Sequence, residues 1–84
     1  MYRVDTDEQA QQQIDALPAE ALPFFAELRT LLEVNPWGGD PVNDQNPDGP
    51  VRILTFGREH EGLATYLVLD DLRRVDLLQL TWLE

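Results

Sequence analysis

Cysteine and lysine are both absent from this 84-residue chain, and histidine occurs only once. Without cysteine the chain has neither a disulfide framework nor a thiolate metal site, and one histidine argues against a zinc cluster. No apolar stretch approaches the roughly 20 residues that cross a bilayer, and the opening MYRVDTDEQA lacks the apolar centre of a signal peptide. We therefore expect a cytoplasmic protein with no metal, no cofactor and no membrane contact.

Basic residues are few: the chain has six arginines and 16 acidic residues, so its net charge is -10. A charge of this sign repels polyanions and attracts basic partners at moderate salt, so general nucleic-acid binding is disfavoured. The same charge also keeps a small protein soluble. A basic partner and a merely solvated surface therefore stay open as alternatives.

The length and the ordinary composition, 43% hydrophobic and 26% charged, predict one domain over residues 1–84. Hydrophobic periodicity predicts the order β-α-α-β-β-β. Residues 2–5 alternate as a strand, and helical spacing follows in residues 7–18, after the cap-like Thr6 and Asp7, and in residues 19–36. Pro23 leaves the start of the second helix open. Residues 51–57, 63–70 and 74–83 predict three strands, and their short links favour hairpins.

Residues 35–50, NPWGGDPVNDQNPDGP, interrupt this regular pattern. Their prolines and glycines prevent a regular hydrogen-bonded element over most of the segment. A loop of this length in a small domain is usually functional or mobile, and Trp37 is the residue that we expect to anchor it.

Two amphipathic helices with one apolar stripe each predict an α+β fold, in which both helices pack on one face of a small antiparallel sheet. Alternation places Val51, Ile53 and Thr55 on one side of the strand and Arg52, Leu54 and Phe56 on the other. Both sides are largely apolar, so the uncovered face is expected to attract a partner chain, unless loop 35–50 folds over it. We expect Arg52 on this uncovered face.

The whole chain resembles the RelE/ParE toxins of bacterial toxin–antitoxin pairs. The resemblance is carried, in order and spacing, by the segments YRV, ALP, NPW, VRILTFG, ATYLVLDD and RRVDLLQLTWL. It implies a small antiparallel sheet flanked by helices, with the site on the sheet face and an antitoxin segment that wraps the toxin. One branch of the family cleaves messenger RNA on the ribosome without metal, and another poisons DNA gyrase.

The family's arginine-isoleucine strand falls on Arg52, so the resemblance implies a phosphate-binding, catalytic role for its guanidinium. Arg58, on the expected hairpin tip, is a weaker catalytic candidate that would join Arg52 as a phosphate clamp in an RNA endonuclease. Pairing of Arg52 with a carboxylate is the equal alternative. His60 is a weaker candidate, as a lone loop histidine. The residues expected to bind a partner on the sheet face are Leu54, Phe56, Tyr66, Arg73 and Trp82.

The absence of lysine, the ending LTWLE and the charge of -10 depart from the basic, RNA-cleaving members. We therefore expect a toxin-family protein that acts through contacts with an antitoxin-like protein, with gyrase or with a second copy of itself as a dimer. The alternative is a ribosome-dependent messenger-RNA endonuclease that uses Arg52.

Overall fold

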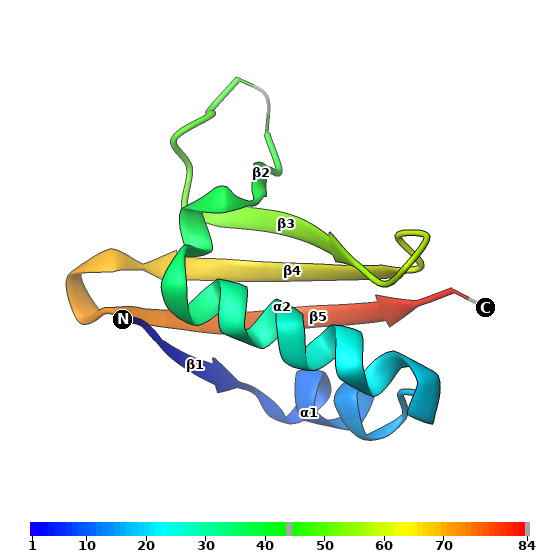
Figure 1. Cartoon of the computed structure of the whole chain (residues 1–84). Coiled ribbons are helices and arrows are strands. Elements are labelled where there is room, and N and C mark those ends of the chain that lie inside the picture. Colours follow the sequence, from blue (N-terminus) through cyan, green and yellow to red (C-terminus); the bar gives the residue numbers. More distant parts are fainter. Residues whose placement is uncertain (44, 84) are drawn as a thin grey trace.

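Alternating apolar residues in the second half of the chain form the three strands that the sequence predicts. The computed structural model describes residues 1–43 and 45–83, and Figure 1 shows its arrangement. Strands β3 (Val51–Phe56), β4 (Gly62–Leu69) and β5 (Arg74–Trp82) are antiparallel neighbours. They form the centre of a five-stranded sheet whose order is β1-β5-β4-β3-β2. The predicted α+β class and the order of the main elements are confirmed.

The two outer strands differ from the sequence prediction. β1 (Arg3–Thr6) runs parallel to β5, with Val4 opposite Val75, so the sheet is mixed. This pairing is possible because two helices lie between β1 and the remaining strands, and a parallel pair needs such a long crossover. β2 (Asp40–Pro41) is a two-residue strand inside the predicted loop, and it pairs with β3.

Local capping determines where the helices begin. α1 (Glu8–Asp15) starts after Asp7, whose side chain accepts a hydrogen bond from the backbone nitrogen of Ala10 at 2.7 Å. α2 (Leu22–Val34) follows the 3-10 turn η1 (Ala19–Ala21). Pro23 lies in the first turn of α2, where the missing N–H costs no intrahelical hydrogen bond. This position settles the boundary that the sequence left open.

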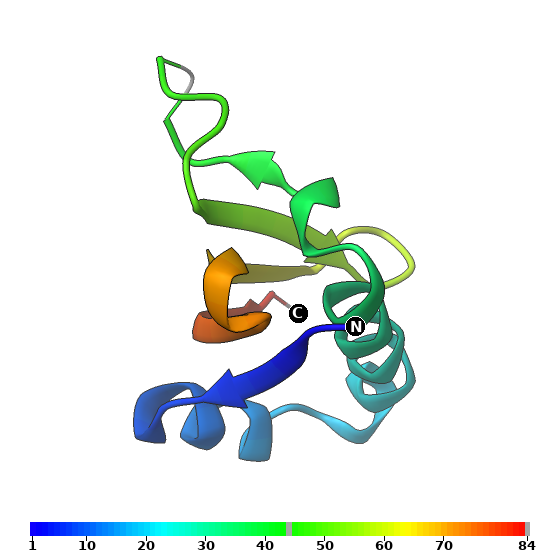
Figure 2. The same cartoon turned by 90° about the vertical axis from the view of Figure 1, so that its left-hand side faces the viewer.

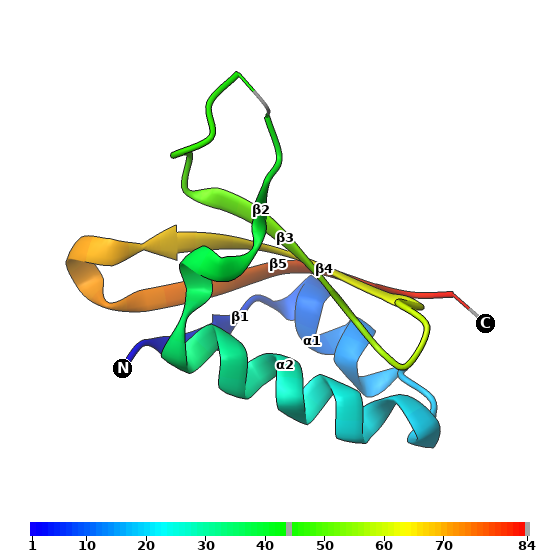
Figure 3. The same cartoon turned by 45° about the horizontal axis from the view of Figure 1, so that its top comes forward.

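Both α-helices lie on one side of the sheet, as Figure 3 shows. α2 runs along the sheet, and α1 packs chiefly against β5, beyond the end of β1. There the side-chain oxygen of Gln13 accepts a hydrogen bond from the backbone nitrogen of Leu80 at 2.6 Å. This bond satisfies a strand-edge group that the short β1 leaves unpaired. The core between helices and sheet comprises Ala10, Leu28, Leu32, Phe56, Ala64, Tyr66, Val68, Val75, Leu77 and Leu80.

The other side of the sheet carries no α-helix in the described part of the chain, as the end-on view in Figure 2 shows. After β2, the described loop residues 42–43 and 45–50 extend away from the sheet edge and do not fold over this side. Among residues 1–43 and 45–83, no helix is long and apolar enough to cross a membrane.

Candidate functional site

The pairing of strands sorts the side chains onto two faces. Arg52 lies opposite Tyr66, and Tyr66 lies opposite Leu77, so these three share the face that the helices cover. The other face, which we call the open face, carries the alternate residues. They are Arg3, Asp5, Val51, Ile53, Thr55, Leu63, Thr65, Leu67, Leu69, Arg74, Asp76, Gln79 and Thr81.

The expected position of Arg52 on the uncovered face is wrong. Arg52 is only 8% exposed, and it lies on the side of the sheet that the helices cover. The guanidinium donates three hydrogen bonds to backbone carbonyls: Nε to Gly49 at 3.2 Å, Nη1 to Gly39 at 2.9 Å and Nη2 to Pro47 at 2.6 Å. Arg52 therefore fastens loop 39–50 to β3. Its partners are carbonyl oxygens, and no carboxylate is bound by it within the described residues.

Four of the five expected binding residues also belong to the helix-covered side. Tyr66 is fully buried, and Leu54 and Trp82 pack against the same core as Phe56. The ring of Phe56 lies 5.6 Å from that of Trp82, between centroids. The prediction that these residues form an accessible binding face is wrong, because both sides of the strands are apolar and the helices cover the side expected to bind the partner.

The hydroxyl of Tyr66 connects the buried side of the sheet to the start of loop 35–50. It donates a hydrogen bond to the carbonyl oxygen of Pro36 at 2.6 Å, and burial raises the pKa of the phenol above its ordinary value. A side chain at Gly39 would overlap this hydroxyl and approach the carbonyl oxygen of Ile53 at 2.8 Å. The glycine therefore allows the loop to cross the end of the core.

The structure does not bring Arg58 to Arg52. Arg58 lies in the turn after β3, whereas Arg52 is the second residue of β3, and the four strand steps from Arg52 to Phe56 alone span about 13 Å. The Arg52 guanidinium is bonded to three carbonyls of loop 39–50, so the two arginines do not form one phosphate clamp. His60, in the same turn, places Nδ1 at 3.0 Å from the Thr55 hydroxyl. In that turn the backbone N–H of Glu59 donates to the Glu61 carboxylate, which lowers the pKa of Glu61.

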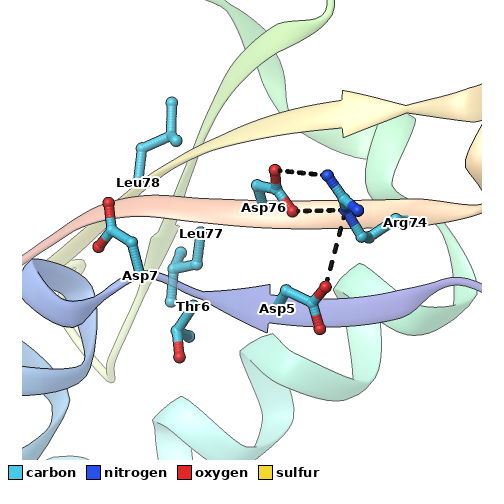
Figure 4. A pocket seen from close by; sticks show the side chains of 7 residues that line it. All are labelled: Asp5, Thr6, Asp7, Arg74, Asp76, Leu77 and Leu78. Atoms are coloured by element: carbon cyan, nitrogen blue, oxygen red, sulfur yellow. Dashed lines mark hydrogen bonds and ion pairs between the residues drawn. The ribbon is translucent and has the colours of Figure 1, made fainter.

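The charged residues of the open face pair with one another at its β1–β5 side. Arg74 donates from Nε to Asp76 at 2.9 Å and lies 3.6 Å from Asp5, as Figure 4 shows. Arg3 donates to the same Asp5 at 3.0 Å. Two guanidinium groups thus meet two carboxylates, and no net positive charge remains there.

A polar cluster joins loop 35–50 to the turn between β4 and β5, the 3-10 turn η3 (Asp70–Leu72). The indole nitrogen of Trp37 donates to Oδ1 of Asp70 at 3.1 Å, and the hydroxyl of Tyr2 donates to the same oxygen. The bond from Tyr2, followed by that from Trp37, lowers the pKa of Asp70. Arg73, the fifth expected binding residue, is exposed and donates to the Tyr2 hydroxyl at 3.1 Å. The predicted anchoring role of Trp37 is confirmed.

Sequence reasoning did not find this cluster, because its members come from three separate segments: Tyr2 at the start of the chain, Trp37 in the loop, and Asp70 and Arg73 in the β4–β5 turn. The pairing of Tyr2 with Asp70 depends on the parallel β1–β5 contact, for which the sequence gives no local signal. Within residues 1–43 and 45–83, no group of three ligand-type side chains is placed to hold a metal ion.

No family model and no curated protein sequence matches the chain. Solved structures do. The isolated Escherichia coli RelE toxin superposes with a TM-score of 0.80 at 15% identity, covering 100% of this chain and 86% of that one. The E. coli RelBE toxin–antitoxin complex superposes with a TM-score of 0.79 at 15% identity, covering 100% of this chain and 99% of that one. The archaeal RelE–RelB complex of Pyrococcus horikoshii OT3 superposes with a TM-score of 0.64 at 21% identity, covering 96% of this chain and 93% of that one. The chain therefore has the RelE toxin fold.

Proposed function

We propose that this RelE-fold chain acts by binding a basic, antitoxin-like protein on its open face, and that it has no RNA-cleaving activity. The observation that carries the proposal is the composition of that face. Apolar side chains of β3 and β4 lie beside arginines that are already paired with Asp5 and Asp76. A partner can bury the apolar part, at about 25 cal/mol per Å² of apolar surface removed from water.

The arrangement of the arginines supports binding over cleavage. Stabilising a phosphorane needs a cation that can reach the phosphate oxygens. Arg52 is buried and bonded to three carbonyls, and Arg3 and Arg74 face carboxylates. The net charge of -10 adds a long-range repulsion of RNA and an attraction for a basic protein.

The similar structures supply the class of partner. Two of them are complexes of RelE with RelB, and one of these is described as a toxin with its antitoxin. An antitoxin-like protein is therefore the partner class that we assign to this chain.

The test compares two leucine-to-aspartate variants with matched exposure. Leu63 is 40% exposed on the open face, and Leu22 is 48% exposed at the start of α2. The chain is co-expressed with the product of the adjoining reading frame, and the complex is measured by size-exclusion chromatography with light scattering. We expect the wild type and Leu22→Asp to form the complex, and Leu63→Asp to bind at least ten-fold more weakly.

Both variants are also induced alone in a bacterial host, and transcripts are mapped. Growth arrest with cleaved transcripts would overturn the proposal in favour of the endonuclease. Equal loss of the complex in both variants, or no complex with the wild type, would also contradict it.

A further inference from the structure

An apolar pocket of about 530 Å³ lies at the end of the sheet where β4 turns into η3. Its apolar lining comes from two separate parts of the chain and includes Trp37, Pro50, Leu67, Leu69 and Leu72. Leu72 is 63% exposed and Trp37 is 36% exposed. Leu67 and Leu69 also belong to the open face, so the pocket continues the surface to which we assign the partner.

Two carboxylates border this pocket, Asp70 and Asp71. Both hydrogen bonds to the side chain of Asp70 end on its Oδ1, from Tyr2 and Trp37. Within the described ranges, Oδ2 of Asp70 and the carboxylate of Asp71 have no hydrogen-bond or ion-pair partner in the chain. An uncharged apolar occupant would remove these oxygens from water without replacing their hydrogen bonds, which is costly.

The chemistry of this lining selects a cation with an aliphatic stem. Carboxylates repel an anionic group, whereas an indole ring attracts a cation over its face. Arg52 already has this arrangement, with its guanidinium carbon 4.9 Å from the centroid of a Trp37 ring. Arg52 does not line the pocket, so part of the indole stays available to a second group. A planar guanidinium can stack on it and donate two parallel bonds to one carboxylate, whereas an ammonium has no planar face and no such donor pair.

We propose that this pocket receives an arginine side chain of the partner protein, with the methylene stem on the leucines and the guanidinium against Trp37, donating to Oδ2 of Asp70 and to the carboxylate of Asp71. This inference rests on the proposed function, since it names the anchoring group of that partner.

The test uses short peptides, so it does not depend on finding the partner. Acetyl-Leu-Arg-Leu-amide is titrated into the labelled protein and followed in ¹H–¹⁵N spectra, beside the same peptide with citrulline, the neutral isostere of arginine. We expect the arginine peptide to shift the Trp37 indole signal and the amides of residues 67–72, and the citrulline peptide to bind at least five-fold more weakly.

Asp71→Asn is the diagnostic variant, because Asp71 makes no contact that holds the fold, and Leu22→Asp is the control. We expect a loss of at least three-fold in affinity for Asp71→Asn and no change for Leu22→Asp. Equal binding of the citrulline peptide, equal binding of a lysine peptide, or shifts confined to another surface would overturn the assignment. If the peptides do not bind the pocket but the complex at the open face still forms, only the assignment of the pocket is refuted, and the proposed function stands.

Discussion

The guanidinium of Arg52 lies over the indole of Trp37, with 4.9 Å between the guanidinium carbon and the ring centroid. Trp37 in turn donates to Asp70, and Arg52 donates to three carbonyls of loop 39–50. Two residues thus connect the loop to β3 on one side and to the β4–β5 turn on the other. The position that the family resemblance assigns to phosphate chemistry has a structural role in this chain.

Arg52→Ala is expected to destabilise the fold by about 2–6 kcal/mol, because it leaves the carbonyls of two buried residues, Gly39 and Gly49, without a donor, and each unsatisfied buried acceptor costs about 1–3 kcal/mol. Arg52→Lys is the matched variant: it keeps the charge but cannot donate in three fixed directions, so we expect a smaller loss. Denaturant unfolding followed by tryptophan fluorescence measures both. An Arg52→Ala protein as stable as the wild type would show that the three bonds do not hold the loop.

Gly39→Ala is expected to destabilise the protein by about 1–3 kcal/mol, since the added Cβ would overlap the Tyr66 hydroxyl. Tyr66→Phe alone removes the bond to Pro36 and is expected to cost about 1 kcal/mol. In the double variant the overlap is relieved in part, so the two losses should add to more than the measured total. A double-mutant cycle of unfolding free energies tests this coupling. Simple additivity would contradict the predicted clash.

Asp76→Asn is expected to cost less than about 1 kcal/mol, because its partner Arg74 is partly exposed and retains Asp5 nearby. The loss should shrink further in high salt, which screens exposed charges. Unfolding at low and high ionic strength measures it. A large loss that does not depend on salt would mean that this pair contributes more to the sheet than its exposure suggests.

The strands and helices could be predicted because each carries a local period, of two residues in β3 to β5 and of 3.6 residues in α1 and α2. Which face of the sheet the helices cover could not be predicted. Alternation correctly separates Val51 from Arg52, yet both sides are apolar, and nothing local states which side the helices cover. The buried position of Arg52 further depends on carbonyls of Gly39, Pro47 and Gly49, which point inward only once the loop has folded.

Asp70 gives a prediction for pH dependence. The bonds from Tyr2 and Trp37 lower the pKa of its carboxyl in the folded state, so folding favours the charged form. The resulting stabilisation is complete above the unfolded-state pKa of about 3.9 and disappears as pH falls through the lower folded-state value. Asp70→Asn keeps an acceptor oxygen but loses the charge.

The wild type should therefore be more stable than Asp70→Asn at pH 7, and this difference should decrease below about pH 4. Asp71→Asn is the control, because Asp71 has no partner within the described ranges, and its difference from the wild type should stay small at every pH. Unfolding free energies between pH 7 and pH 2.5 measure all three proteins. A difference for Asp70→Asn that is independent of pH would mean that Tyr2 and Trp37 do not favour its charged form, and the cluster would then hold the loop through its neutral hydrogen bonds alone.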